Sequence, residues 1–278
     1  MTRLFGVIGH PIDHSLSPIL HGAAFKALRV DARYAPFDVP KPVLSPILHG
    51  LVNAGVEGLN VTVPLKEAVI PLMDRLDPTA KAIGAVNTIV IRRRRLTGYN
   101  TDAAGFLRAL HELGWKPRRT RAVILGAGGA ARAVAWALSQ TRGSCLTIAN
   151  RHVDRAGTLA RWLKQVRPHC DVRAIPLRQV ALAKVDLLIN ATSVGLRASD
   201  KSPIDASQLH RGLLVYDLIY HRNTALVQAA RRRGCVAAGG LSMLLYQGAE
   251  SFRLWTGRRP PIAVMRAALQ GAVKQKHQ

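Results

Sequence analysis

The chain has 278 residues, of which 48% are hydrophobic and 5% aromatic, with 23 Gly and 15 Pro. This length fits one large or two ordinary domains with a buried core, and the composition excludes a collagen, a coiled coil and a mostly disordered chain. Lys and Arg number 40 against 16 Asp and Glu, so the formal net charge is +24. This excess requires us to consider a polyanionic partner.

No apolar stretch approaches the roughly 18 residues of a membrane span, and the apolar run that begins at Leu4 is too short for a signal peptide. Cys145, Cys170 and Cys235 form no C-x-x-C pair and are odd in number. A disulfide scaffold or a zinc ribbon is therefore not expected. The histidines show no paired ligand spacing, so no metal site is predicted. We expect a cytoplasmic protein with no membrane partner.

Short apolar runs alternate with helix-like segments in the first hundred residues. Strands are predicted at residues 4–8, 34–39, 58–61 and 85–91, and helices at 18–28, 43–54 and 65–72. Ser17 is the expected N-cap of the first helix, since Pro18 suits the first helical position. Strands and helices that alternate in this way predict an α/β fold with a mostly parallel sheet.

A second series of the same kind follows a junction near residues 101–104. Strands are predicted at 121–125, 146–149, 187–191 and 214–218, with a buried helix at 130–141. Residues 241–269 look helical and lead into a polar tail, 274–278. The chain therefore has the pattern of two successive α/β regions.

Residues 123–131 read Val-Ile-Leu-Gly-Ala-Gly-Gly-Ala-Ala, a strand, a glycine turn and a helix start that fit G-x-G-x-x-A. Gly126 permits the tight turn, Gly128 lets a pyrophosphate approach the backbone, and Ala131 lets the helix pack close to its strand. The first N–H groups of the helix are free to bind phosphate. The predicted dinucleotide-binding turn consists of Gly126, Ala127, Gly128, Gly129 and Ala130.

The tip of the following strand carries Asn150 and Arg151, and Arg155 comes one turn later. An NAD site usually has a carboxylate here for the ribose 2′-hydroxyl. A guanidinium instead forks onto the 2′-phosphate of NADP. Asp154 lies four residues beyond the tip and is expected to face away. The sequence therefore favours NADP over NAD, against the alternative that these are two of many arginines in a basic chain.

Four polar clusters lie near predicted strand ends in the first hundred residues, at 14–18, 60–66, 84–88 and 98–102. Open α/β sheets bind their ligands at such ends. Serine hydroxyls near a helix start suit a carboxylate, Asn and Thr suit a polyhydroxylated ring, and Lys66 with Asp102 suits proton transfer. Singly, each has a structural interpretation: Ser17 and Asp102 as helix caps, Asn87 as a turn residue, Lys66 as an exposed lysine.

Together and in this order, the motifs resemble the shikimate dehydrogenase family over nearly the whole chain. Besides the clusters, the matching segments are Gly9-His-Pro-Ile-Asp-His-Ser-Leu-Ser-Pro, Gly126-Ala-Gly-Gly-Ala, Asn150-Arg151, Asn190-Ala-Thr-Ser-Val-Gly, Val215-Tyr-Asp-Leu-Ile-Tyr and Gly240-Leu-Ser-Met-Leu-Leu-Tyr-Gln. The resemblance implies a discontinuous substrate-binding α/β domain, 1–102 plus 241–278, whose C-terminal helices pack back on it. Residues 103–240 would form a Rossmann-type NADP-binding domain.

The resemblance also implies a role for each matching residue. Ser15 and Ser17 would hold the substrate carboxylate; Asn60, Thr62, Asn87 and Asp102 would bind ring hydroxyls, with Lys66 beside the reacting oxygen; Tyr220 and Gln247 would complete the pocket; Leu218 and Gly240 would lie near the nicotinamide. His152 stands where a small hydroxyl residue is common in the family, so it would stack on adenine or pair with the 2′-phosphate.

The implied reaction is the reversible, NADPH-dependent reduction of 3-dehydroshikimate to shikimate in chorismate and aromatic amino acid biosynthesis. Lys66 and Asp102 would handle the proton and orient the reacting hydroxyl. The sequence leaves open which of the two is the formal acid or base. The near alternative is a quinate/shikimate dehydrogenase that uses NAD or both cofactors. The family offers both monomers and homodimers.

A remote alternative of another class is a protein that binds nucleic acid or another polyanion. Basic runs occur at 92–95, 116–121 and 231–233 and in the tail. These runs fall in predicted loops and strand ends, where a solvated face is the default. Aromatics are scarce and no DNA- or RNA-binding motif is present. We therefore expect nonspecific, salt-sensitive adherence to polyanions rather than a specific nucleic-acid partner.

Overall fold

The computed structural model describes residues 2–117 and 119–275, which form two compact units. Unit 1 runs as far as Gly105 and resumes at Leu245, and unit 2 is Phe106–Leu244. Arg118 and residues 276–278 of the predicted polar tail lie outside the described residues. Over the described ranges, none of the helices combines the length and apolarity that crossing a membrane demands.

Unit 1 contains a six-stranded sheet with the strand order β2-β1-β3-β5-β6-β4. Its strands are β1 (Arg3–Gly9), β2 (Ala32–Asp38), β3 (Val56–Val61), β4 (Arg75–Leu76), β5 (Thr88–Arg92) and β6 (Arg95–Tyr99). Its helices include α1 (Ser17–Ala27), α2 (Leu44–Asn53), α3 (Pro78–Ile83) and α9 (Ile262–Gln275). Helices α4 (Asp102–Glu112) and α8 (Leu241–Thr256) each continue across the division between the units.

The sheet of unit 1 is mostly parallel, as predicted, with β5 as its antiparallel strand and β4 parallel to β6. β1 pairs in parallel with β2 and β3, whereas β5 runs antiparallel to both β3 and β6. β5 and β6 form a hairpin whose two turn residues, Arg93 and Arg94, have φ values of 48° and 63°. Two residues of positive φ give the turn a twist that matches the strands, so a tight hairpin replaces a helical crossover here.

Unit 2 is an all-parallel sheet with the strand order β12-β11-β10-β7-β8-β9. Its strands are β7 (Arg121–Leu125), β8 (Cys145–Asn150), β9 (Asp171–Pro176), β10 (Leu187–Asn190), β11 (Leu214–Asp217) and β12 (Val236–Gly239). The helices within it are α5 (Gly129–Ser139), α6 (Val153–Val166) and α7 (Ala225–Arg232). Numbered from β7, the order is 3-2-1-4-5-6, which is that of a Rossmann fold.

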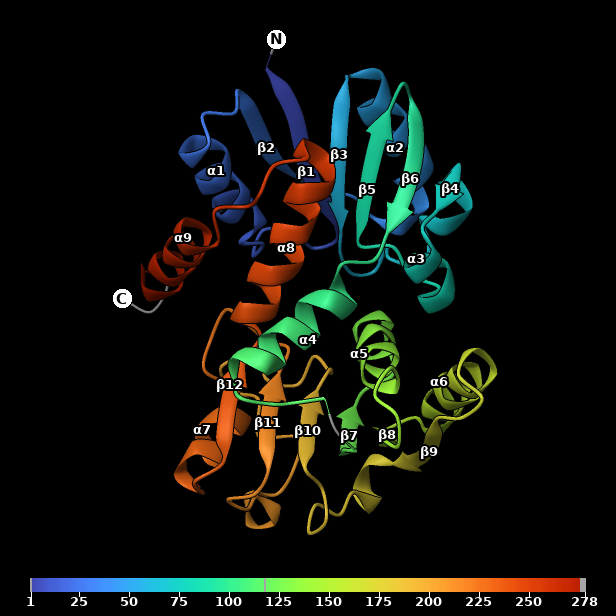
Figure 1. The fold of residues 1–278 in the computed structure, drawn as a ribbon, viewed down its shortest axis with the longest axis vertical. Helices are drawn as coiled ribbons and strands as arrows, with labels where there is room; N and C mark the ends of the chain where they lie inside the picture. Colours follow the sequence, from blue (N-terminus) through green and yellow to red (C-terminus); the bar gives the residue numbers. More distant parts are fainter. Residues whose placement is uncertain (1, 118, 276–278) are drawn as a thin grey trace. The chain divides into compact units, whose positions relative to one another are not determined.

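Helix α8, the last helix but one of the described chain, is anchored on the sheet of unit 1 (Figure 1). The Trp255 ring lies 5.2 Å from the ring of Phe5 on β1, and its indole N–H donates to the carbonyl of Ile89 at 3.0 Å. Gly58 on β3 makes room for this ring, since a Cβ there would collide with it. A residue late in the chain thus completes the core of a unit that begins at the N-terminus.

Two of the expected helical features are wrong near the N-terminal motifs. Residues 65–72 form one turn and a short 3₁₀ helix, Ile70–Leu72, instead of an α-helix. Pro71 has no N–H to donate and disfavours helical geometry in the residue before it. Ser17 is the first residue of α1 rather than its N-cap, which is Leu16. The backbone N–H of Ser17 instead donates to the Ser15 hydroxyl at 3.3 Å.

The stretch expected to be helical at 241–269 is confirmed as two helices, α8 and α9, separated by residues 257–261. Gly257 has φ +69° and ends α8 in the left-handed region. Pro260 and Pro261 follow, and neither has an N–H to continue the ladder. The break lets α9 turn and pack on α1 (Figure 1).

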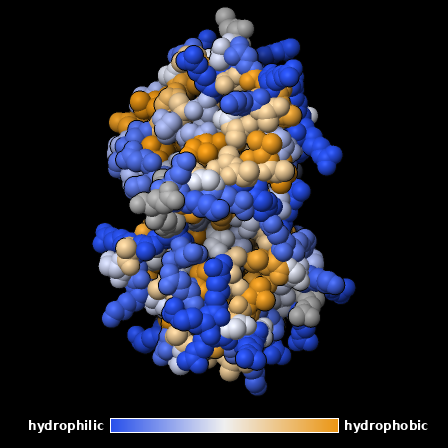
Figure 2. Space-filling model, turned by 90° about the vertical axis from the view of Figure 1, so that its left-hand side faces the viewer, coloured by the Kyte–Doolittle hydropathy of each residue, from blue (hydrophilic) through white to orange (hydrophobic). Residues whose placement is uncertain are grey.

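The charge excess lies mostly at the surface. Figure 2 shows one face of the molecule, on which hydrophilic side chains predominate and smaller apolar areas lie between them. Apart from Lys66–Asp102, the ion pairs found in the described part of the chain are exposed or partly exposed contacts, such as Arg3–Glu57 and Arg253–Glu250. Exposed pairs of this kind contribute little to stability.

Candidate active site

Lys66 and Asp102 form a close ion pair in unit 1. The Lys66 ammonium donates to Asp102 Oδ2 at 2.6 Å, and the two side chains are 16% and 6% exposed. Asp102 is the first residue of α4, but the side chain of Asn100 caps the helix by accepting from the N–H groups of Asp102 and Ala103. The Asp102 carboxylate therefore does not cap α4 and is free to face Lys66, which is not an exposed lysine.

Asn87 fixes the second oxygen of the Asp102 carboxylate. Its side-chain NH₂ donates to Asp102 Oδ1 at 2.8 Å, while its Oδ1 accepts from the backbone N–H of Thr101 at 2.7 Å. The same NH₂ lies 3.2 Å from Gln247 Oε1 on α8. Both carboxylate oxygens thus have donors, one of them charged, which holds the Lys66–Asp102 pair in one geometry.

Gln247 reaches Asn87 because α4 and α8 pack closely at one point. A Cβ on Gly105 would lie 2.7 Å from the backbone nitrogen of Gln247, closer than real Cβ atoms approach. Asn60, 5% exposed at the end of β3, joins the cluster by donating to the carbonyl of Asn87 at 3.3 Å. The structure thus connects Asn60, Lys66, Asn87, Asp102 and Gln247 in one hydrogen-bonded cluster.

The other predicted residues of unit 1 lie at the same end of the sheet. Ser15 and Ser17 follow the carboxyl end of β1, and Thr62 follows that of β3, its parallel neighbour. The Thr62 N–H donates to the Ile8 carbonyl at 2.9 Å, which closes the end of this pair of strands. Asn87 precedes β5 and Asp102 follows β6, and the antiparallel pairing of these strands brings both to this edge.

Four polar residues of this region received no role from the sequence: Tyr34, Thr88, Thr101 and Ser251. Thr88 and Thr101 stand beside Asn87, within hydrogen-bond distance of its amide, and Ser251 donates to the Gln247 carbonyl one turn further along α8. Ser251 comes four residues after Gln247, and this spacing places both on the same face of a helix. The spacing could have identified Ser251 from the sequence. No sequence pattern points to Tyr34, because it reaches Asn60 from a different strand.

The glycine turn of unit 2 fits a dinucleotide. Gly126 has φ +104°, and a Cβ there would lie 2.8 Å from the carbonyl oxygen of Ala191. A Cβ on Gly128 would meet no atom within 4 Å, and Gly128 is the N-cap of α5 without a side-chain bond. There is therefore room beside Gly128, at the start of α5, where a pyrophosphate suits the helix dipole. Ala127, Gly129 and Ala130 complete this segment.

The tip of β8 carries the residues predicted to read the 2′-phosphate. Asn150 Oδ1 accepts from the N–H of Arg151 at 2.9 Å, and His152 is the N-cap of α6 without a side-chain bond. Arg151 lines a cavity of about 430 Å³ together with Arg178, which the sequence did not single out. In the described chain, neither guanidinium has an ion pair, and both are exposed, as is Arg155 in the first turn of α6.

The residues predicted near the nicotinamide lie together at the carboxyl ends of β11 and β12. A Cβ on Gly240 would collide with the backbone of Leu218, so only glycine fits there. Buried Asp217 accepts from Asn190 at 3.0 Å and Thr224 at 2.6 Å and so ties down the loop that carries Tyr220. Burial raises the pKa of Tyr220, which keeps the phenol protonated. Tyr220 belongs to unit 2, whereas the cluster around Lys66 and Asp102 belongs to unit 1.

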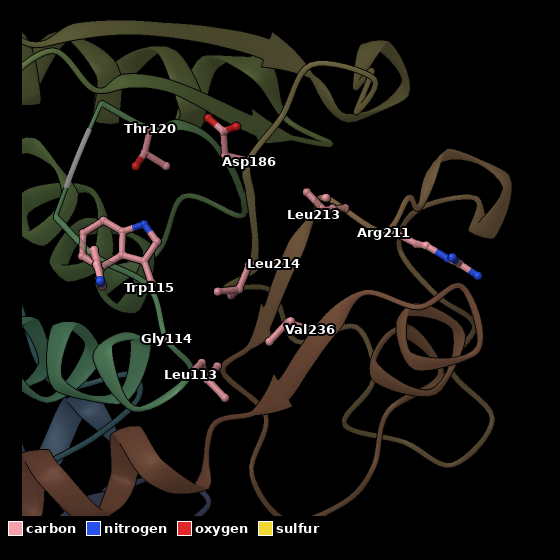
Figure 3. A pocket seen from close by; sticks show the side chains of 11 residues that line it. Leu113, Gly114, Trp115, Thr120, Asp186, Arg211, Leu213, Leu214 and Val236 are labelled. Carbon is pink, nitrogen blue, oxygen red and sulfur yellow. The ribbon is translucent and has the colours of Figure 1, made fainter.

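Figure 3 shows a different cavity of unit 2, of about 430 Å³. Its lining residues include Asp186, Leu214 and Val236. Asp186 precedes β10, and the other two begin β11 and β12, so the cavity lies at the amino ends of these strands. Ligands of open parallel sheets bind at the carboxyl ends. This cavity is therefore separate from the glycine turn at the other end of the same strands.

Taken together, a Rossmann unit with a phosphate-binding turn and a second α/β unit with a buried Lys–Asp pair define a dinucleotide-dependent oxidoreductase. Three family models match almost the whole chain. Their descriptions are the shikimate dehydrogenase substrate binding domain over residues 7–89, shikimate/quinate 5-dehydrogenase over 109–229, and the shikimate 5′-dehydrogenase C-terminal domain over 240–270.

Individual relatives agree with these models. The shikimate dehydrogenase (NADP⁺) of Methanopyrus kandleri is 46% identical over 276 residues, covering 96% of this chain and 95% of the relative. That of Moorella thermoacetica is 47% identical over 278 residues, covering 98% and 94%. A crystal structure from Thermus thermophilus, in complex with NADP(H) and shikimate, superposes with a TM-score of 0.88 at 40% identity, covering 98% and 100%.

The chain belongs to the shikimate dehydrogenase family. The resemblance carried by its sequence motifs and the predicted two-domain α/β fold are thereby confirmed. The two curated relatives are named as NADP⁺ enzymes, and the crystal structure holds NADP(H) and shikimate. The alternatives of an NAD-dependent quinate enzyme and of a polyanion-binding protein are therefore not favoured.

Proposed function

We propose that this chain catalyses the reversible, NADPH-dependent reduction of 3-dehydroshikimate to shikimate. One observation carries the proposal: the Lys66–Asp102 pair, 2.6 Å long and held by Asn87, in a chain 46–47% identical to NADP-dependent shikimate dehydrogenases. It is an NADP-dependent oxidoreductase that acts on a CH–OH group, and its product is an intermediate of chorismate and aromatic amino acid biosynthesis.

The substrate residues divide by chemistry. The hydroxyls of Ser15 and Ser17 hold the carboxylate, because they stand at the start of α1, where partial positive charge favours an anion. A ring hydroxyl both donates and accepts hydrogen bonds. It therefore suits the amide groups and the carboxylate at this end of the sheet. These residues are Asn60, Thr62, Asn87 and Asp102, with Gln247 and Tyr220 completing the pocket.

NADPH, when bound, supplies the hydride. As negative charge develops on the carbonyl oxygen, the Lys66 ammonium stabilises it and gives a proton from Nζ to that oxygen. Asp102 accepts a hydrogen bond from the same Nζ and so holds the ammonium in position before the transfer. Asn87 keeps the carboxylate in place throughout. In the oxidising direction Lys66 takes the hydroxyl proton back.

For the cofactor, the backbone from Gly126 to Ala130 cradles the pyrophosphate at the start of α5. Arg151 and Arg155 pair with the 2′-phosphate beside Asn150, and His152 contacts the adenine or the same phosphate. Leu218 and Gly240 contact the nicotinamide. The exposed guanidinium groups at the tip of β8 support this assignment.

The substrate domain corresponds to residues 1–102 plus 241–278 and the NADP domain to 103–240, in our proposal. The compact units of the structure divide three to four residues later, at Gly105/Phe106 and Leu244/Leu245. We place the enzyme in the cytoplasm, where a reducing environment suits the free thiols of Cys145, Cys170 and Cys235. It acts as a monomer or a homodimer.

Steady-state kinetics with shikimate and with quinate, each with NADP⁺ and with NAD⁺, test the proposal. We expect the highest kcat/KM for shikimate with NADP⁺. A folded protein that binds both ligands and oxidises no shikimate would contradict the proposal. A higher kcat/KM for quinate with NAD⁺ would assign the chain to the alternative enzyme of the same family.

A further inference from the structure

Tyr34 on β2 is clamped beside the substrate-side cluster of unit 1. Its hydroxyl donates to Asn60 Oδ1 at 2.7 Å. Its ring stacks on the imidazole of His21, with centroids 4.6 Å apart and planes 14° from parallel, and lies 6.2 Å from the ring of Trp255. His21 is fully buried. The aromatic ring therefore has one position, and its hydroxyl is held against the Asn60 amide.

The neighbours of Asn60 determine which way its amide points. The backbone carbonyl of Asn87 only accepts hydrogen bonds, so the atom that faces it at 3.3 Å is the NH₂. The same NH₂ lies 3.0 Å from the Ser251 hydroxyl. The amide oxygen is left on the other side, where Tyr34 is its donor. Without the tyrosine hydroxyl, this buried oxygen would lose its donor.

Burial raises the pKa of Tyr34 well above its ordinary value. The hydroxyl thus stays protonated over the working range of pH. It therefore remains a hydrogen-bond donor to Asn60, a residue assigned to the ring hydroxyls.

We propose that Tyr34 is a positioning residue for the substrate, whose hydroxyl holds the Asn60 side chain in the orientation that binding of the ring requires. The inference rests on the proposed function. Tyr34 reaches the reacting pair only through Asn60 and Asn87, since Asn60 donates to the Asn87 carbonyl and the Asn87 side chain donates to Asp102. Its removal should therefore weaken substrate binding more than it slows the chemical step.

The variant Tyr34→Phe keeps the stacked ring and removes the hydroxyl alone. A hydrogen bond of this kind contributes about 0.5–1.5 kcal/mol, so we expect KM for shikimate to rise by about 2–13-fold. We expect kcat to change by less and KM for NADP⁺ to stay at the wild-type value. The matched control is Tyr246→Phe on α8, which removes a hydroxyl that accepts from Arg266 and lies outside the cluster. It should leave all three constants unchanged.

A double-mutant cycle with Asn60→Ala separates positioning from a general structural effect. If Tyr34 acts through Asn60, Tyr34→Phe adds little to the KM of Asn60→Ala. Fully additive effects, or an unchanged KM in Tyr34→Phe, would overturn the inference. Equal changes in KM for shikimate and for NADP⁺ would do the same.

A second readout does not depend on turnover. The side-chain NH₂ resonance of Asn60, assigned by its loss in Asn60→Ala, should shift in Tyr34→Phe and stay in place in Tyr246→Phe. If the wild-type protein failed to oxidise shikimate, the proposed function would fall while this spectrum still reported on Tyr34. An unmoved resonance in Tyr34→Phe would reject the role of Tyr34 even in an active enzyme.

Discussion

The substrate-side cluster of unit 1 and the cofactor-side groups of unit 2 are built in opposite ways. Lys66, Asn87 and Asp102 hydrogen-bond to one another and are largely buried. At the tip of β8, by contrast, Arg151 is exposed, and the start of α5 has no side-chain cap. One region satisfies its polar groups internally, and the other leaves them to be satisfied by a ligand.

The difference shows how each region does its work. Polar groups that are already hydrogen-bonded to one another before the substrate binds need no reorganisation during the reaction. Free cationic groups attract an anion over a distance and are screened by salt. Substitutions of Lys66, Asn87 and Asp102 should therefore change kcat and be strongly coupled, whereas substitutions at the tip of β8 should change cofactor affinity and selectivity.

The largest effect is expected for Lys66→Ala. Loss of a general acid–base group should lower kcat by about 10²–10⁴-fold, with a smaller change in KM. Steady-state kinetics at saturating shikimate and NADP⁺ check this, with Lys81→Ala, an exposed lysine of α3, as the control. Near-wild-type turnover of Lys66→Ala would remove Lys66 from its role.

The next effect is on cofactor choice. Arg151→Asp replaces a charge that suits the 2′-phosphate by one that repels it. A hydrogen bond to a charged group contributes about 1.5–3 kcal/mol, so the kcat/KM ratio of NADP⁺ over NAD⁺ should fall by about 10–150-fold. Arg161→Asp, at an exposed position further along α6, is the matched charge change. Unchanged selectivity in Arg151→Asp would show that the 2′-phosphate is read elsewhere.

The substrate-side cluster also borders a buried titratable group. Burial lowers the pKa of His21 to about 3, although Asn60 opposes the shift. Below the unfolded-state pKa of about 6.5 the unfolded chain binds the extra proton, so stability is lost as pH falls toward 3, at about 1.4 kcal/mol per pH unit. Denaturant unfolding at several pH values should show that His21→Gln has a shallower slope than wild type. His49→Gln, on the exposed side of α2, should keep the wild-type slope, and identical slopes in all three proteins would contradict this.

The smallest effect is expected for Arg178→Ala. Arg178 lines the same cavity as Arg151 but also shares it with Asp205, whose carboxylate reduces the local positive charge. An exposed charge contributes about 0.2–1 kcal/mol, so the selectivity for NADP⁺ should fall by about 1.4–5-fold, less than for Arg151→Asp. Titration of 2′,5′-ADP binding at two salt concentrations measures it. An effect as large as that of Arg151→Asp would make the two arginines equal readers of the phosphate.

Local chemistry made much of unit 2 predictable. The turn at Gly126 follows from glycine conformation and the strand–helix pattern around it, and the structure shows the positive φ that the turn needs. The apolar run 121–125 is a strand with those same bounds. β9 was missed, because its residues alternate between exposed and partly buried at the edge of the sheet and so give no apolar run.

The contacts of unit 1 depend on strand pairing that the sequence does not reveal. Tyr34 reaches Asn60 only because β2 and β3 both pair in parallel with β1, in a particular register. Gln247 reaches Asn87, 160 residues away in the chain, only because α8 returns to the sheet of unit 1. Motifs indicated the candidate residues, but not which of them hydrogen-bond to each other.

The contrast between the two regions is tested most directly by kcat/KM for shikimate with NADP⁺ in two double-mutant cycles. In Lys66→Ala with Asp102→Asn, residues that act as a unit should give a double variant little worse than the poorer single one. In Lys66→Ala with Arg151→Ala, which share no hydrogen-bond partner among the described residues, the losses should multiply. If the losses in kcat/KM multiplied in the first cycle, the account would be contradicted. It would also be contradicted if the wild-type protein did not oxidise shikimate.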